Sequence, residues 1–257
     1  FGTTISWWVA ALAGWLLVAV MGVSNVDFSA KVLGILVALE FVVVAAVSVL
    51  SLGVAPEGIT AETVRPSQFF TDGIGVLLAF GIAAFMGFES GAIYSEEARD
   101  PERTVPKATY IAVGTIALFY AFSAWAFAQG VGPSVVIDKA TELGPDLVFV
   151  WLGDYSALAA NIANCLFVTS LIAALVAFHN AAARYFFSLG RSRVLPKKFA
   201  TSSAKGAPIA GSLTQTTLAV VVVAGFAVAG NGSEMGELFP VLTLFTWLTN
   251  AAAFGLV

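Results

Sequence analysis

Residues 69–91 read FFTDGIGVLLAFGIAAFMGFESG, an apolar run that ends in a carboxylate flanked by glycines. An ionisable side chain inside a membrane segment costs about 2.5–3.5 kcal/mol on insertion scales and usually faces an internal cavity. Gly87 and Gly91 also weaken a helix, because each costs about 1 kcal/mol relative to alanine. We therefore predict a membrane helix over 67–95 with a break near 87–91, where unpaired backbone groups can bind a polar ligand. The alternative is a helix that ends early and leaves Glu89 at the lipid headgroups.

The composition indicates an all-α membrane protein. Of the 257 residues, 59% are hydrophobic and 11% charged, and the mean hydropathy is +0.91, whereas about a quarter of the residues of a soluble domain are charged. The sequence has no basic run or glycine-rich phosphate loop of the kind that nucleic-acid or nucleotide binders carry. With one His, one Cys and no metal-binding or nucleophile motif, we expect neither an enzyme nor a cofactor or metal site.

Seven apolar segments are long enough to cross the hydrocarbon core, which takes about 20 residues. We predict a single transmembrane domain over 1–257, with helices at 5–23, 29–52, 67–95, 106–128, 155–189, 208–230 and 236–257. Apolar residues between the Gly-Pro pairs at 132–133 and 144–145 suggest short interfacial helices in the loop over 130–154. Because the chain starts without Met and ends inside an apolar run, we expect it to be part of a longer protein.

Lys and Arg residues are distributed unevenly between the two sets of loops. One set, with the turn near Lys31, the segment 96–107 and the segment 184–205, holds ten of them, and the other set holds Arg65 and Lys139. Cytoplasmic loops carry the excess of Lys and Arg. We therefore predict that Phe1 lies outside and that residues 96–107 lie in the cytoplasm.

The predicted helix over 155–189 carries several polar side chains. By helical spacing, several of them share a stripe that predicts a polar internal face rather than a lipid-facing one. They are Asn161, Asn164, Cys165, Thr169, Ser170, His179 and Asn180. His179 could relay protons, but near the end of a helix it can equally be a polar residue with its hydrogen bonds satisfied.

Two stretches resemble the amino acid permeases of the amino acid–polyamine–organocation superfamily. The first is GFES at 87–90 followed by EEARDPERTVPKA at 96–108, and the second is NAAARYFFSLGR at 180–191 followed by VLP at 194–196 and AP at 207–208. The resemblance implies an inverted-repeat, LeuT-like helix bundle of twelve helices, of which this chain would hold helices four to ten. The substrate-facing first helix would then be missing.

The resemblance also implies the substrate site. Carbonyls of Ala84, Phe85 and Met86, at the end of the outer half-helix, would receive the α-amino group of a substrate. The negative end of a helix dipole suits an ammonium group, which supports this assignment independently. Gly87, Phe88, Glu89, Ser90 and Gly91 complete the predicted binding segment. Phe85 or Phe88 could act as a gate, or could simply face lipid or core. Residues 96–107 could form part of an inner gate or be a solvated loop.

Glu89 and Glu40 are the candidate proton carriers, because a carboxyl removed from water can exchange protons near neutral pH. Family members can carry a lysine near the position of Glu40. The charge here is reversed, so lysine-type coupling does not transfer, and Glu40 could also be a carboxyl held neutral by hydrogen bonds or one that snorkels toward the membrane surface. Thr169 and Ser170 resemble the hydroxyl pair of sodium-coupled relatives. Such hydroxyls also bond carbonyls of their own helix.

These observations predict a secondary active transporter of amino acids or related amines in the plasma membrane. It would work by alternating access, with the lipid bilayer as its setting and a proton as coupling ion. An amino acid:amine exchanger without ion coupling is the first alternative. A non-transporting sensor or transport subunit with the same fold is the second.

Overall fold

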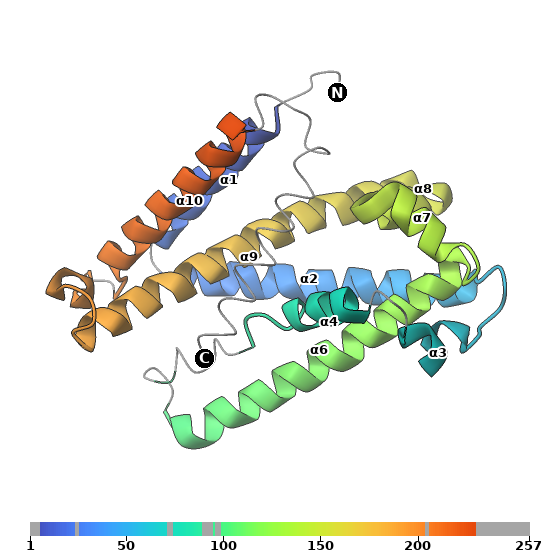
Figure 1. Ribbon diagram of the computed structural model, residues 1–257, viewed down its shortest axis with the longest axis horizontal. Helices are drawn as coiled ribbons and strands as arrows, with labels where there is room; N and C mark the ends of the chain where they lie inside the picture. Colours follow the sequence, from blue (N-terminus) through green and yellow to red (C-terminus); the bar gives the residue numbers. More distant parts are fainter. Residues whose placement is uncertain are drawn as a thin grey trace. The chain divides into compact units, whose positions relative to one another are not determined.

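The computed structural model describes residues 6–23, 26–70, 74–88, 95, 99–203 and 206–229, with the backbone only for 26–33, 68–69, 76, 79–80 and 83. Every regular element in these ranges is a helix (Figure 1). The α-helices are α1 (Trp7–Gly22), α2 (Val26–Gly53), α3 (Pro66–Phe69), α4 (Ile74–Ala83), α6 (Pro101–Val131), α7 (Val136–Leu143), α8 (Leu147–Tyr155), α9 (Ala157–Arg191) and α10 (Ile209–Ala229). Short 3₁₀ helices span Glu62–Val64, Gly144–Asp146 and Lys197–Ala200.

Four of the described helices are long and apolar enough to cross a membrane, judged by length and composition. They are Gly34–Gly53 within α2, and the whole of α6, α9 and α10. The shorter α1 is also apolar. The predicted all-α class is therefore confirmed for the described part of the chain, and the seven crossings and the inverted repeat stay predictions. The predicted helix over 236–257 lies outside the described residues.

The chain divides into two units, the first made of residues 1–30 and 172–257 and the second of residues 31–171. In the first unit, α1 packs along α10, and Trp15 Nε1 donates a hydrogen bond of 2.8 Å to the Thr216 carbonyl (Figure 1). The C-terminal half of α9 joins α10 through His179 and Ser212, whose side chains are 2.8 Å apart. A side chain at Gly22 would overlap the His179 ring, so glycine permits this approach.

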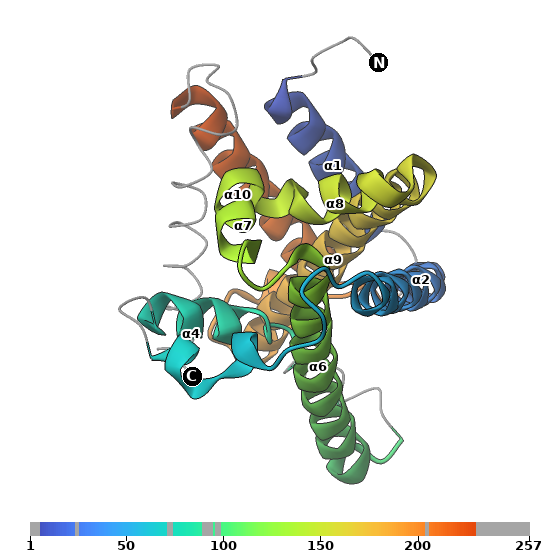
Figure 2. The same cartoon turned by 90° about the vertical axis from the view of Figure 1, so that its right-hand side faces the viewer.

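The second unit contains most of α2, then α3, α4, α6, α7, α8 and the N-terminal half of α9. Its buried core consists of Val131, Trp151, Leu152, Ala160 and Ala163. The short helices α7 and α8 follow the end of α6 (Figure 2), as the apolar residues in this predicted loop suggested. Trp151 Nε1 donates to the Gly130 carbonyl at 3.1 Å, so α8 is fixed to the last turn of α6.

The loop between α2 and α3 is fastened to α6 by a buried amide. The Gln129 side chain is fully buried, and its Oε1 accepts a 2.8 Å hydrogen bond from the Thr60 backbone N–H. Its Nε2 donates to Thr63 Oγ1 at 3.3 Å, and Trp125 Nε1 donates to the Thr60 carbonyl at 3.2 Å. We refer to Gln129, Thr60, Thr63 and Trp125 as the Gln129 cluster.

Two helix boundaries differ from the prediction more than the others do. α6 begins at Pro101 and passes through Pro106, where we expected the helix to start. Proline suits a first helical position, and Pro106 removes only one further hydrogen bond, to the exposed end of the helix. The predicted helix over 67–95 contains α3 and α4, and α4 already ends at Ala83, before the glycine at which we placed the break.

Candidate functional site

The end of α4 gives the first part of the candidate site. After Ala83 the chain continues through tight turns over 84–88, in which the Phe85 N–H bonds to Ile82 O at 3.0 Å and the Phe88 N–H to Phe85 O at 3.3 Å. Gly87 has a φ of 97°, in the left-handed region that glycine adopts without steric cost. The regular helix therefore ends four residues before this glycine.

The predicted substrate carbonyls lie in these turns. The Phe85 carbonyl is already engaged by the Phe88 N–H, which leaves its second lone pair for another donor. Ala84 and Phe88 are exposed, and Phe85, Met86 and Gly87 are partly buried. Glu89, Ser90 and Gly91 lie outside the described residues, so the binding role of 84–91 stays a prediction.

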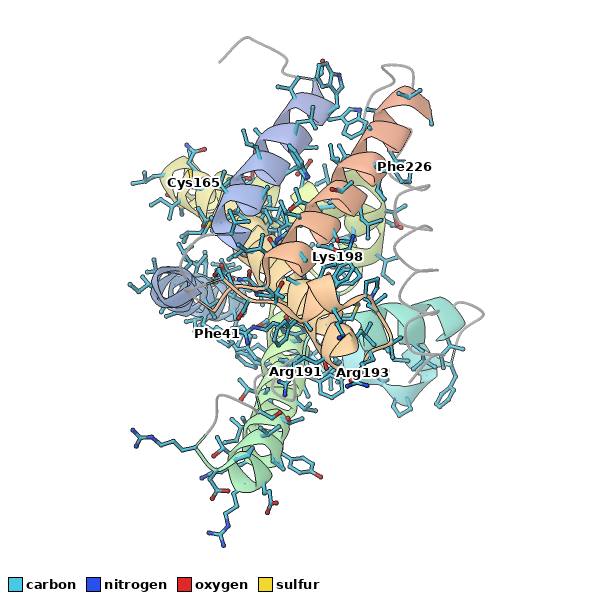
Figure 3. All side chains as sticks on the ribbon, turned by 90° about the vertical axis from the view of Figure 1, so that its left-hand side faces the viewer. Phe41, Cys165, Arg191, Arg193, Lys198 and Phe226 are labelled. Carbon is cyan, nitrogen blue, oxygen red and sulfur yellow. The ribbon has the colours of Figure 1, made fainter. Side chains whose placement is uncertain are left out.

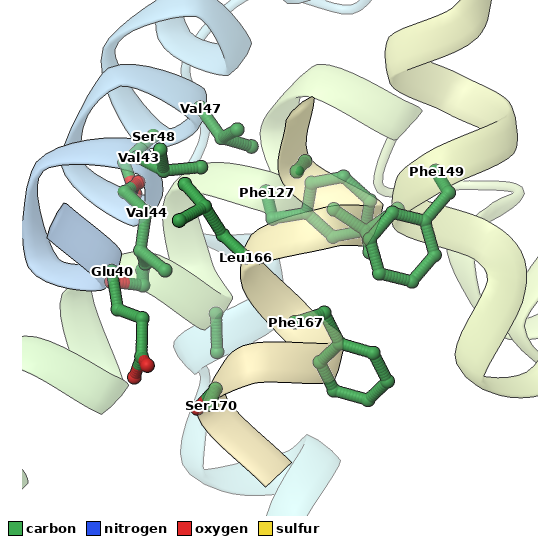
Figure 4. Close-up of a pocket in the computed structure, with 14 residues that line it drawn as sticks. Glu40, Val43, Val44, Val47, Ser48, Phe127, Phe149, Leu166, Phe167 and Ser170 are labelled. Atoms are coloured by element: carbon green, nitrogen blue, oxygen red, sulfur yellow. Dashed lines mark hydrogen bonds between the residues drawn. The ribbon is translucent and has the colours of Figure 1, made fainter. Parts of the chain in front are cut away.

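The second part of the candidate site is a cavity of about 370 Å³ within the second unit. Its walls come from α2, α6, α8 and α9 (Figure 4). The lining residues are Glu40, Val43, Val44, Val47 and Ser48 of α2, Ser123, Ala124 and Phe127 of α6, Val148 and Phe149 of α8, and Ala163, Leu166, Phe167 and Ser170 of α9. The cavity is thus mostly apolar, with one carboxyl group.

Glu40 provides that carboxyl group. Its Oε1 is inaccessible to solvent and has no hydrogen-bond partner among the described residues. Burying such an oxygen without a donor is unfavourable, so a hydrogen-bond donor bound in the cavity would find an acceptor here. The alternative in which Glu40 is held by hydrogen bonds finds no donor for Oε1 in the described part of the chain.

Serine hydroxyl groups also line this cavity, and they differ in their hydrogen bonds and in their positions. Ser48 donates to the Val44 carbonyl and Ser123 to the Phe119 carbonyl, both at 2.7 Å and both within their own helices. Ser170 lies with Glu40 toward one end of the cavity, and Phe127 and Phe149 lie toward the other (Figure 4). The structure therefore brings together two predicted coupling residues, Glu40 and Ser170, that are 130 positions apart in the sequence.

Thr169, the other member of the predicted hydroxyl pair, is directed to its own helix. Its Oγ1 donates to the Leu166 carbonyl at 2.8 Å, and Thr169 is absent from the residues that line the cavity. This is the local hydrogen bonding that we gave as the alternative to a sodium site. Within the described residues, no group of three or more His, Cys, Asp or Glu side chains could hold a metal ion.

The predicted polar stripe of α9 is not one buried face in the described structure. Asn161, Asn164 and Cys165 are exposed. The buried positions of α9 are mainly small apolar residues, namely Ala160, Ala163, Ala173, Val176, Ala181 and Ala183. Small side chains allow close helix approach, so they, rather than the polar residues, occupy the packed face. His179 is buried with Ser212 in the first unit, as the second of its two interpretations expected.

The Gln129 cluster and the aromatic wall of the cavity were missed from the sequence. Phe127 and Phe149 are apolar residues among many, and nothing in their spacing singles them out. Gln129 had a usable signal, because an amide in the last turns of an apolar helix needs a partner. Trp125, one turn earlier, also carries a polar N–H that needs an acceptor.

Comparison with known proteins indicates the kind of protein in which this site lies. The sequence profile described as amino acid permease matches residues 1–256. The histidine permease of Lactococcus lactis subsp. cremoris is 29% identical over 177 residues, which cover 66% of this chain and 37% of that protein. The lysine-specific permease of the same organism is 31% identical over 160 residues, or 60% of this chain and 31% of that protein.

A third relative covers more of the chain. The D-serine/D-alanine/glycine transporter of Escherichia coli O6:H1 is 26% identical over 260 residues, which cover 95% of this chain and 54% of that protein. The aligned regions therefore span between about a third and about half of the length of these curated relatives. No solved structure matches this chain.

Proposed function

The chain belongs to the amino acid permease family and is an integral membrane protein, and we propose that it is part of a secondary active transporter for amino acids or related amines. The match over residues 1–256 is the observation that carries the proposal. The relatives named above are described as permeases or transporters of histidine, lysine, or D-serine, D-alanine and glycine. A plasma-membrane location follows from the same family. Transport requires no covalent chemistry, so the proposal excludes an enzymatic role.

In this proposal, the end of α4 receives the ammonium group of the substrate. The C-terminal end of a helix carries about half a negative elementary charge, and α4 ends at Ala83, directly before the turns over 84–88. Broken helices of inverted-repeat transporters bind their substrates in this manner. A LeuT-like bundle with seven crossings in this chain is part of the proposal, with the carboxylate of the substrate bound by a helix outside this sequence.

Glu40 is the coupling residue of the proposal. Its buried Oε1 without a donor, together with Ser170 on the same cavity, supports a position for a proton. Thr169 does not line this cavity, so Ser170 is the one member of the predicted hydroxyl pair that does. Proton symport is therefore favoured over sodium symport. Exchange without ion coupling and a sensor that does not transport remain the alternatives that the experiment separates.

The test uses the full-length protein that contains this chain, reconstituted in vesicles. The substrate is first found by a thermal-shift screen of amino acids and amines, because a ligand that binds only the folded state raises its stability. Uptake is then measured after an imposed pH step and, separately, as exchange of labelled for unlabelled substrate at equal pH. Wild-type protein should concentrate the substrate when the outside is acidic.

The informative variant is Glu40→Gln, which keeps the shape of the side chain and cannot ionise. It should lose pH-driven accumulation while exchange stays within about tenfold of wild type. The control is Glu62→Gln, because Glu62 is an exposed acid of the same unit, 3.3 Å from Arg65. It should behave as wild type. Accumulation by Glu40→Gln at the wild-type level would remove Glu40 from the coupling role, and exchange without any pH-driven uptake in wild type would establish the exchanger.

A further inference from the structure

The segment that follows α9 is rich in positive charge, and the transport mechanism proposed above assigns no role to this charge. Residues 191–198, which we call the basic segment, read RSRVLPKK and contain four cations in eight residues. The sequence has no Asp or Glu between Asp154 and Glu234. By contrast, the basic residues at the start of α6, Arg99 and Arg103, alternate with Asp100 and Glu102.

The basic segment has a defined conformation. Arg193 has a φ of 62°, in the left-handed region that often ends a helix, and the Val194 N–H bonds to Leu189 O at 3.0 Å. The 3₁₀ helix Lys197–Ala200 then folds back against the end of α9. A Cβ atom built on Gly190 would lie 2.7 Å from Phe199 Cβ, and the Phe186 and Phe199 rings are 5.9 Å apart. The backbone that carries the cations is therefore packed against the end of α9.

The cationic side chains of the basic segment are all exposed, namely those of Arg191, Arg193, Lys197 and Lys198. Figure 3 labels Arg191, Arg193 and Lys198. Within the described part of the chain, neither Arg193 nor either lysine forms an ion pair. Apolar surface lies among these charges, since Val194 is 70% exposed, and Lys198 Nζ lies 5.5 Å from the centre of the Phe199 ring.

The position of the basic segment in the chain indicates what it meets. α9 is one of the candidate membrane-spanning helices and ends at Arg191, so the basic segment directly follows a membrane-spanning helix and lies on one side of the membrane. Clusters of Lys and Arg next to a membrane helix attract anionic lipids, and arginine binds phosphate oxygens through a planar pair of N–H groups. An exposed valine among the cations suits the boundary between headgroups and acyl chains better than it suits a soluble anion.

We propose that the basic segment binds the headgroups of anionic phospholipids in the membrane leaflet at which α9 ends. Arg193, Lys197 and Lys198 hold the phosphate groups, and Val194 contacts the acyl region. The binding is electrostatic, so its strength falls as the salt concentration rises.

The test measures binding of fluorescent phosphatidylglycerol to the full-length protein in detergent, with phosphatidylcholine as the neutral lipid. Wild-type protein should prefer phosphatidylglycerol. The variant Arg193→Gln/Lys197→Gln/Lys198→Gln should bind it about a hundredfold more weakly, given the contribution of each basic residue at an anionic surface. These side chains are exposed, so gel filtration should show a folded protein.

Two matched variants distinguish binding at the basic segment from a general effect of the protein's charge. Arg99→Gln/Arg103→Gln/Lys107→Gln removes the same charge from another basic cluster and should stay within about threefold of wild type. Arg193→Lys/Lys197→Arg/Lys198→Arg keeps the charge and should also stay within about threefold. An equal loss in the first control would show a general charge effect and overturn the proposal, and a hundredfold loss in the second would overturn its electrostatic basis.

Three further outcomes would overturn the proposal. One is equal affinity for the two lipids, and another is unchanged phosphatidylglycerol binding by the triple Gln variant. The third is displacement of the labelled lipid by glycerol phosphate at an equal concentration, which would show a site for a soluble phosphate rather than for a lipid headgroup.

Discussion

Gly130 shows how a single residue sets the distance between two helices. A Cβ atom built at this position would lie 2.6 Å from Ser51 Cβ and 2.7 Å from Ser51 Cα of α2. The Gly130 carbonyl accepts a hydrogen bond from the indole N–H of Trp151. The last turn of α6 therefore touches both α2 and α8 at one glycine.

Gly130→Ala should destabilise the protein by about 1–3 kcal/mol, because an added methyl group in a closely packed place forces the backbones apart. The control is Gly114→Ala on the same helix, where a Cβ atom would meet nothing within 4 Å. That change should stabilise by up to about 1 kcal/mol through helix propensity. Thermal denaturation of the full-length protein in detergent measures both. Equal midpoints for the two variants would contradict the close approach.

Substitution of Glu89 distinguishes a proton-carrying role from a position at the lipid headgroups. If it cycles between protonated and ionised forms, Glu89→Gln should flatten the pH dependence of transport and change substrate binding by less than about tenfold, or about 1.4 kcal/mol. If donors pair with its carboxylate, Glu89→Ala should also lower the amount of folded protein, because donors left unpaired cost about 1–3 kcal/mol. Wild-type pH dependence in both variants would place Glu89 among the headgroup-level residues and leave Glu40 as the coupling candidate.

Among the elements, the loop over 54–65 is held to the end of α6 by more than the Gln129 cluster. Glu57 Oε1 accepts hydrogen bonds from the Ser134 hydroxyl at 2.6 Å and from the Ser134 N–H at 3.2 Å. The loop is therefore joined to both sides of the α6 terminus. If the proposed transport cycle moves α6, this loop should move with it.

Gln129→Leu should release the loop, because the Thr60 N–H loses its acceptor and a buried donor without a partner costs about 1–3 kcal/mol. Hydrogen exchange of the Thr60 amide should become faster, while amides in the middle of α6 keep their protection. Gln215→Leu in α10 makes the same chemical change in the first unit and should leave Thr60 unaffected. Unchanged exchange at Thr60 would mean that the Trp125 and Glu57 contacts hold the loop without Gln129.

For the whole molecule, the distribution of Lys and Arg predicts how the chain is oriented in the membrane. Ten of the twelve basic residues lie in one set of loops, which the positive-inside rule assigns to the cytoplasm. The basic segment and the start of α6 belong to this set. The segment that contains α7 belongs to the other.

Cysteine labelling tests this orientation. In a Cys165→Ser background, Ser202→Cys should react with an impermeant reagent only after the cells are permeabilised, and Glu142→Cys should react in intact cells. Both positions are exposed, so accessibility to the reagent reflects the side of the membrane. The background change makes the introduced cysteine the single thiol of this chain, because Cys165 is its one cysteine. The opposite pattern would invert the predicted topology.

Composition and apolar run length determined the all-α class and the approximate places of the described long helices, because the membrane requires about 20 apolar residues with internally paired backbones. The motifs at 87–108 and 180–208 were enough to indicate the family. The glycine and proline signals placed the end of α4 and the start of α6 only to within a few residues. A single helix contains both Pro101, which follows an aspartate, and Pro106, five residues later.

Only the tertiary structure decided which polar side chains meet. Ser170 shares a cavity with Glu40 while its neighbour Thr169 bonds the Leu166 carbonyl, and Gln129 meets Thr60 across 69 positions. Helical periodicity is a local property and fixes which residues share a face. The rotation of each helix against its neighbours depends on how closely small residues such as Gly22, Gly130 and Ala163 allow them to pack, and this is a property of pairs of helices that no single segment contains.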